Sequence, residues 1–136
     1  NNSLKQYTVE LNCEDISKLP SIFFPTLFQE KINKEIDVRI FYLNGECYCM
    51  GIMNKLIDYR MDFSKSRNFP IIIPDSLKTK IIKLMGKLNL QTGSLDFLKS
   101  IDDNQFYFLE VNPNGQFDFV SQKCNYYLEK KIAQYL

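Results

Sequence analysis

The sequence from 106 to 117 reads Phe106-Tyr-Phe-Leu-Glu-Val-Asn-Pro-Asn-Gly-Gln-Phe117. Aromatic and β-branched residues dominate its first half, which predicts a β-strand, and the Pro and Gly that follow Asn112 predict its end. Because side chains alternate between faces along a strand, Phe106, Phe108, Glu110 and Asn112 are expected on one face. The carboxylate and the amide oxygen are hard ligands, which suit Mg²⁺.

A second carboxylate lies upstream, in the strand predicted over 92–98. A hairpin centred near Asp103 places Asp96 opposite Glu110, about 5 Å away at Cβ. Two carboxylates this close repel one another unless a cation lies between them. We therefore predict that one hairpin presents Asp96, Glu110 and Asn112 to a single metal ion. A slip of one residue would move Asp96 to the other face, and a solvated hairpin end with ordinary turn residues is the alternative interpretation.

The composition narrows the class of protein. The 136 residues suit one domain or part of one, and 45% of them are hydrophobic, enough for a packed core. A net charge of +1 gives no basic field for nucleic acid. No stretch has the length and apolarity of a membrane span, and no signal-peptide pattern opens the sequence. We therefore expect a cytoplasmic protein that binds neither nucleic acid nor membrane.

The residue types exclude some chemistry. There is no histidine, so catalysis by a histidine acid or base is excluded. The four cysteines, at positions 13, 47, 49 and 124, match neither a zinc knuckle nor a CxxC redox pair and are interpreted as reduced thiols. What remains is chemistry by positioning and charge stabilisation, of which phosphoryl transfer is an example.

Asn44-Gly45 lies between two alternating segments, 36–43 and 46–53, and predicts the clearest hairpin of the chain. In the first segment, Arg39 is on the face opposite to Val38. An arginine on an otherwise apolar strand seeks a carboxylate or a phosphate. A salt bridge to Asp37 or Glu35 is the alternative, and Glu35 shares the side of Arg39 if the strand is regular that far back.

The other expected elements follow from hydrophobic periodicity and from the positions of turn-forming and capping residues. Before the first hairpin we expect a short edge strand over 7–11, a helical turn over 14–19 capped by Asn12, and a strand over 26–32. After it we expect a polar loop over 54–70 and an amphipathic helix over 74–88 capped by Asp75 or Ser76. The chain ends with a connection over 119–124 and an amphipathic helix over 125–136, which is capped by Asn125 and has Leu128, Ile132 and Tyr135 inward. Together they predict an α+β fold with a mainly antiparallel sheet flanked by helices.

The run Leu109-Glu-Val-Asn-Pro-Asn-Gly-Gln-Phe117 resembles the C-terminal metal motif of the ATP-grasp ligases, above all the graspetide (microviridin-type) synthetases. The Gly-Gln-Phe ending and the tail from Cys124 to Leu136 resemble the branch called grasp-with-spasm peptide maturases. The resemblance covers nearly the whole chain. It implies the C-terminal half of an ATP-grasp fold, with 1–28 as a remnant of the lid domain and linker and 29–136 as the C-terminal subdomain.

The resemblance also implies ATP and Mg²⁺ as cofactors and a role for each site residue. The residues beside the adenine are Glu30, Lys31 and Ile32, the ribose acceptor is Glu35, the residue facing the reacting phosphate is Arg39, and the metal ligands are Asp96, Glu110 and Asn112. A charged edge strand and turn is the alternative interpretation of 30–35. The family tends to carry Asp-Phe/Trp-Arg where this chain has Asp62-Phe63-Ser64, so a substrate role for Arg67 is not assigned.

The implied reaction is ATP-dependent ligation that crosslinks a ribosomal precursor peptide with a leader, as a macrolactone or macrolactam. The phosphate-binding lysines of the family belong to parts that precede this sequence, so the fragment alone is expected to be inactive. A homodimer is a possible assembly. The alternatives are a non-catalytic nucleotide- or peptide-binding module and an amino-acid ligase of the same superfamily.

Overall fold

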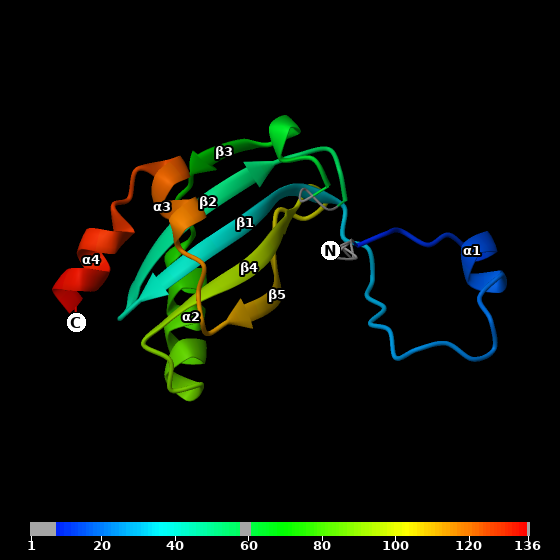
Figure 1. Ribbon diagram of the computed structural model, residues 1–136, viewed down its shortest axis with the longest axis horizontal. Coiled ribbons are helices and arrows are strands. Elements are labelled where there is room, and N and C mark those ends of the chain that lie inside the picture. Colours follow the sequence, from blue (N-terminus) through cyan, green and yellow to red (C-terminus); the bar gives the residue numbers. More distant parts are fainter. Residues whose placement is uncertain (1–7, 58–60, 136) are drawn as a thin grey trace, which may run out of the picture.

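A computed structural model of the chain describes residues 8–57 and 61–135. Its centre is a five-stranded antiparallel sheet in the order β3-β2-β1-β4-β5 (Figure 1). The strands are β1 (Lys34–Leu43), β2 (Glu46–Met53), β3 (Arg67–Pro70), β4 (Thr92–Ser100) and β5 (Phe106–Asn112). The helices are α1 (Cys13–Ser17), the 3-10 turn η2 (Phe63–Lys65), α2 (Asp75–Lys87), α3 (Asp118–Cys124) and α4 (Leu128–Tyr135). The predicted α+β class is confirmed.

The β1–β2 hairpin forms as predicted. Asn44 and Gly45 have φ of 44° and 92°, the pair of positive values that a two-residue type I′ turn requires. Side chains of β1 alternate between the two faces of the sheet, so they contribute to two separate hydrophobic cores. Val38 and Ile40 pack with Ile81 and Met85 of α2.

The opposite face of the sheet packs against the C-terminal helices. Phe41 and Met50 contact Val120 of α3 and Leu128 of α4. Figure 1 shows α2 on one side of the sheet and α3 and α4 on the other. Alternating residues of β1 therefore serve different layers, and Arg39 lies on the α3/α4 face.

The segment before β1 differs from its prediction. Asn12 does cap α1, since its Oδ1 accepts from the backbone N–H groups of Glu14 and Asp15. The strand predicted over 26–32 is wrong, because these residues are irregular and pair with none of the strands that the structure describes. Residues 8–11 are not a strand either, and Tyr7 lies outside the described residues.

Three other boundaries differ. The polar loop predicted over 54–70 contains η2 and β3, with 58–60 outside the described residues. Neither Asp75 nor Ser76 caps α2, whose N-cap is Pro74 without a side-chain bond. The predicted connection over 119–124 belongs to α3.

The tail also contains two helices where one was predicted. Asn125 ends α3 in the left-handed conformation and does not begin α4. Leu128 and Ile132 pack inward as predicted, whereas Tyr135 is 42% exposed, and Leu136 lies outside the described residues. None of the helices in the described residues combines the length and apolarity that crossing a membrane requires.

Candidate functional site

Three charged side chains form one row across the sheet. In the strand register, Arg39 of β1 is opposite Asp96 of β4, and Asp96 is opposite Glu110 of β5. The predicted pairing of Asp96 with Glu110 is therefore confirmed. The row crosses three adjacent strands, although β2, β3 and α2 lie between β1 and β4 in the chain.

A β-bulge beside this row changes which residues share a face. The register shifts between Asp96, opposite Glu110, and Phe97, opposite Phe108, so Leu109 is the extra residue. The rings of Phe97 and Phe108 meet edge to face, with 5.5 Å between centroids, and Phe97 belongs to the α2 core. The expectation that Phe108 shares the face of Glu110 is wrong, because a bulge inserts one residue into the alternation.

Asn112 lies on the same face of the sheet as the carboxylates of Asp96 and Glu110. It lies opposite Ser94, two residues before Asp96 on β4, so both pairs face the same way. The Oδ1 of Asn112 accepts from the backbone N–H of Asn114 at 3.0 Å, which closes the turn that the Asn-Pro-Asn-Gly sequence predicts. The second lone pair of that oxygen can still bind a cation.

Arg39 and Asp96 form an ion pair on the half-buried side of the row. The guanidinium Nε lies 3.4 Å from Oδ1 of Asp96, and the two side chains are 15% and 25% exposed. The alternative partners expected for Arg39 are wrong. Asp37 pairs with Lys34 at 2.7 Å, and Glu35 pairs with Lys99.

Two buried polar atoms at this site have no hydrogen-bond partner. They are Nε of Arg39 and Oγ of Ser94. In residues 8–57 and 61–135, one other buried side-chain atom lacks a hydrogen-bond partner, Oδ1 of Asn68. Ser94 is 1% exposed and lies between Phe41 and Asn112 in the register. Unpaired buried polar groups are costly and call for an explanation. Sequence reasoning missed Ser94, although its position two residues before Asp96 places it on the same face.

The residues expected around the nucleotide are not gathered on this face. Glu30 is exposed and Ile32 half-buried, while Lys31 forms an ion pair with Glu10 at 2.7 Å. The backbone at 30–32 makes no hydrogen bond to another backbone group of the described residues.

Glu35 lies at an irregular point of β1. The register shifts between Lys34 and Ile36, so the strand is not regular from Glu35 to Arg39. The Glu35 carboxylate pairs with Lys99, which is opposite Ile36 of the α2 core. Glu35 therefore borders a hollow of about 370 Å³ with Phe69 and Phe106 on that side of the sheet.

The donor set on the α3/α4 face fits magnesium. No group of three or more His, Cys, Asp or Glu residues in the described part of the chain could hold a metal alone. Mg²⁺ needs only one or two carboxylates beside water and phosphate oxygens. Asp96, Glu110 and the Asn112 amide oxygen supply that number of hard ligands on one face.

No family model matches the chain, and no curated protein sequence matches it. Solved structures do match its fold. The macrocyclase MdnB from Microcystis aeruginosa MRC has a TM-score of 0.68 and 24% identity over 79% of this chain and 32% of that chain. A Chryseobacterium gregarium RiPP-associated ATP-grasp ligase in complex with ADP and a leader and core peptide has a TM-score of 0.59 and 22% identity over 69% of this chain and 30% of that one.

The ATP-grasp ligase PsnB, complexed with a phosphomimetic variant of its minimal precursor, Mg and ADP, has a TM-score of 0.57 and 21% identity over 71% of this chain and 30% of that chain. The present chain thus spans less than a third of the length of each structure. It shares the fold of part of these three proteins, two of which are ATP-grasp ligases, so the predicted fold is confirmed.

Proposed function

We propose that this chain is the C-terminal part of an ATP-dependent ligase that crosslinks a ribosomally made precursor peptide. The observation that carries the proposal is the row of Arg39, Asp96 and Glu110 on one face of a sheet with an ATP-grasp fold. In the same proposal, residues 29–136 form the C-terminal subdomain, and 1–28 are the end of the lid domain and its linker. The resemblance of the tail after Cys124 to peptide maturases supports a peptide as the substrate, rather than a free amino acid.

The reaction proceeds in two displacements. A carboxylate oxygen of the peptide attacks the γ-phosphorus of ATP, ADP leaves, and an acyl phosphate forms on the peptide. A hydroxyl or amine of the same peptide then attacks the acyl carbon, inorganic phosphate leaves, and the attacking group loses its proton. The product is an ester or amide crosslink, and the peptide loses one water in total. Neither step needs a protein nucleophile, which agrees with a chain that has no histidine.

Asp96, Glu110 and Asn112 would hold Mg²⁺, which neutralises charge on phosphate oxygens during phosphoryl transfer. The planar guanidinium of an arginine matches the geometry of phosphate oxygens. The guanidinium of Arg39 is already held beside Asp96, so it can stabilise the transferred phosphoryl group without a large reorganisation. The Nε of Arg39, which contacts Asp96 only as an ion pair, and the Oγ of Ser94 lack hydrogen-bond partners, which supports a polar ligand at this face.

The nucleotide contacts are proposed for the segment before β1. The backbone of Glu30, Lys31 and Ile32 makes no hydrogen bond to another backbone group of the described residues. It can therefore offer a donor and an acceptor to the edge of an adenine. Glu35 is the proposed ribose acceptor. Its carboxylate must leave the ion pair with Lys99 to accept hydrogen bonds from the ribose hydroxyls.

The proposed location is the cytoplasm and the proposed assembly is a homodimer. The four cysteines are free thiols, which suits a reducing compartment.

The test is a calorimetric titration of the chain with Mg·ADP and with ADP in EDTA, followed by mass spectrometry of a synthetic precursor peptide incubated with the complete ligase and Mg·ATP. We expect binding that requires Mg²⁺ and a loss of one water for each crosslink. Nucleotide binding that is indifferent to Mg²⁺ would remove the metal assignment. Peptide binding without ATP turnover by the complete protein would favour the non-catalytic module.

A further inference from the structure

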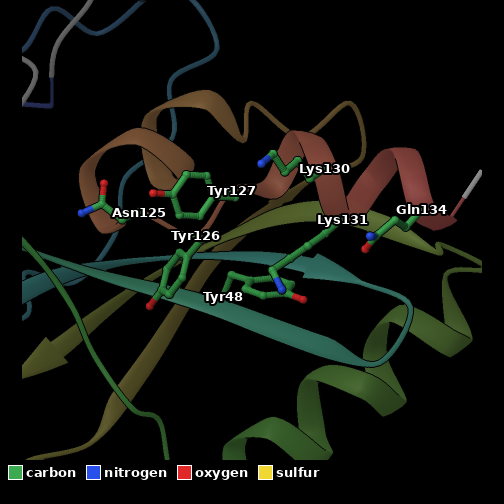
Figure 2. A pocket seen from close by; sticks show the side chains of 7 residues that line it. All are labelled: Tyr48, Asn125, Tyr126, Tyr127, Lys130, Lys131 and Gln134. Carbon is green, nitrogen blue, oxygen red and sulfur yellow. The ribbon is translucent and has the colours of Figure 1, made fainter.

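A second concave surface lies away from the metal hairpin, between α4 and β2. We call it the α4 groove, and its volume is about 560 Å³. Its lining includes Tyr48 of β2, Tyr126 and Tyr127 of the α3–α4 link, and Lys130, Lys131 and Gln134 of α4. Figure 2 shows Lys131 reaching from α4 to the ring of Tyr48, with Tyr126 beside it.

In the described part of the chain, neither Lys130 nor Lys131 forms an ion pair with a carboxylate. Lys131 Nζ lies 5.3 Å from the centre of the Tyr48 ring, and Lys130 Nζ lies 5.6 Å from that of Tyr127. None of the described residues that line the groove carries a carboxylate. The lysines that have carboxylate partners lie elsewhere, at positions 18, 31, 34, 65, 78 and 99. Ring faces hold the two ammonium groups in place but leave their donors available to an anion.

The backbone at the groove keeps one ring in solvent. Tyr127 has φ of 53°, a left-handed conformation that is uncommon for a bulky residue. Its side chain is 60% exposed. Such conformations persist where the surrounding structure imposes them, often at binding sites. Tyr126 is fixed in contrast, because its hydroxyl donates to the carbonyl of Cys49 at 2.7 Å.

The groove adjoins an open strand edge. β3 pairs with β2 only from Met50 to Met53, so the first half of β2 has no strand on its outer side in the residues that the structure describes. The carbonyl of Cys49 accepts from Ile71 and Tyr126, so it points away from β1. The N–H and C=O of Cys47, two residues earlier, point the same way. An extended peptide can add to such an edge.

We propose that the α4 groove binds an extended acidic peptide segment of another protein. Carboxylates of the segment pair with Lys130 and Lys131, apolar side chains contact Tyr48 and Tyr127, and the peptide backbone pairs with the edge at Cys47. The net charge of +1 favours a peptide over nucleic acid, because nucleic-acid binding is driven by a strong basic field. This binding requires neither metal nor nucleotide, so it can be tested independently of the proposed ligase function.

The test uses the 136-residue chain without Mg²⁺ or nucleotide. The probe is a short fluorescein-labelled peptide in which glutamates alternate with leucines, and its glutamine counterpart serves as the reference. We expect the glutamate peptide to bind by fluorescence anisotropy and the glutamine peptide to bind much more weakly. The double variant Lys130→Gln/Lys131→Gln should weaken binding about tenfold, which corresponds to about 1.4 kcal/mol.

The matched control is Lys80→Gln/Lys83→Gln on α2. It makes the same charge change at two exposed helical lysines on the other side of the sheet. We expect it to bind the glutamate peptide like the wild type. Equal weakening in both double variants, or equal affinity for both peptides, would overturn the proposal. So would an RNA oligonucleotide that binds through Lys130 and Lys131 while the acidic peptide does not.

Discussion

Asp96 of β4 and Glu110 of β5 lie directly opposite each other on one face of the sheet, with Arg39 on the far side of Asp96. Opposed like charges destabilise a strand pair. Arg39 offsets the charge of Asp96 through its Nε, 3.4 Å from the carboxylate. Among residues 8–57 and 61–135, no basic side chain forms an ion pair with Glu110, so a cation between the two carboxylates would stabilise this face.

The first prediction concerns the metal ligands. Glu110→Gln keeps the shape of the side chain but removes the charge that a divalent ion requires. We expect Mg·ADP affinity to fall by about tenfold or more, equivalent to about 1.4 kcal/mol, in a calorimetric titration. Glu46→Gln, a change at an exposed glutamate on β2, is the control and should bind normally. Unchanged affinity in Glu110→Gln would count against the metal assignment.

The second prediction separates binding from turnover. Arg39→Ala should leave Mg·ADP affinity nearly intact but lower crosslinking by the complete ligase by about 100-fold or more, the scale for removal of one charge-stabilising donor. Arg39→Lys should recover only part of the rate, since an ammonium lacks the planar fork of the guanidinium. Mass spectrometry of the peptide measures the product, and full crosslinking by Arg39→Ala would remove this residue from the mechanism.

The third prediction compares two buried serines. Ser121 accepts from the N–H of Leu128 at 3.0 Å and donates to Glu129, whereas Oγ of Ser94 has no partner. Ser121→Ala should lower the free energy of unfolding by about 1–3 kcal/mol. Ser94→Ala should be neutral or stabilising, because it removes a hydroxyl that is buried and unpaired. Urea denaturation measures both, and an equal loss in the two variants would contradict the contacts.

The fourth prediction concerns thiol reactivity. Burial raises the pKa of Cys49 to about 12 and that of Cys47 to about 11, and the thiolate is the reactive form. Cys13 is exposed. We expect iodoacetamide at pH 8 to label Cys13 first and Cys49 last, as read by peptide mass spectrometry. In urea all four should label at similar rates, and rapid labelling of native Cys49 would show that its core opens easily.

The fifth prediction is a pH dependence at α4. The hydrogen bond from Ser121 lowers the pKa of Glu129. A carboxyl whose pKa is lower in the folded state contributes stability above its unfolded pKa of about 4.3, and this contribution disappears as the pH falls through the folded pKa. The stability difference between wild type and Glu129→Gln should therefore shrink on acidification from pH 6 towards pH 2. A difference independent of pH would contradict the Ser121–Glu129 contact.

Several features of this protein followed from local sequence. Asn44-Gly45 between alternating residues specified a tight hairpin, because few residues tolerate the two positive φ values of that turn. The pairing of Asp96 with Glu110 was predicted from a hairpin centred near Asp103, but it depends on the bulge, because the register next to the turn, with Lys99 opposite Phe106, would by itself place Asp96 opposite Leu109. The β1–β2 turn could be predicted because its geometry depends on residues close together in the chain.

The tertiary structure decided the rest. The pairing of Arg39 with Asp96 joins β1 to β4, and no local pattern encodes which distant strand will adjoin. The bulge at Leu109 separated Phe108 from Glu110, since Phe108 packs on Phe97 in the other core. Residues 26–32 have a strand-like composition but pair with none of the strands that the structure describes. A strand exists only where another backbone completes its hydrogen bonds, and that condition is set by the fold as a whole.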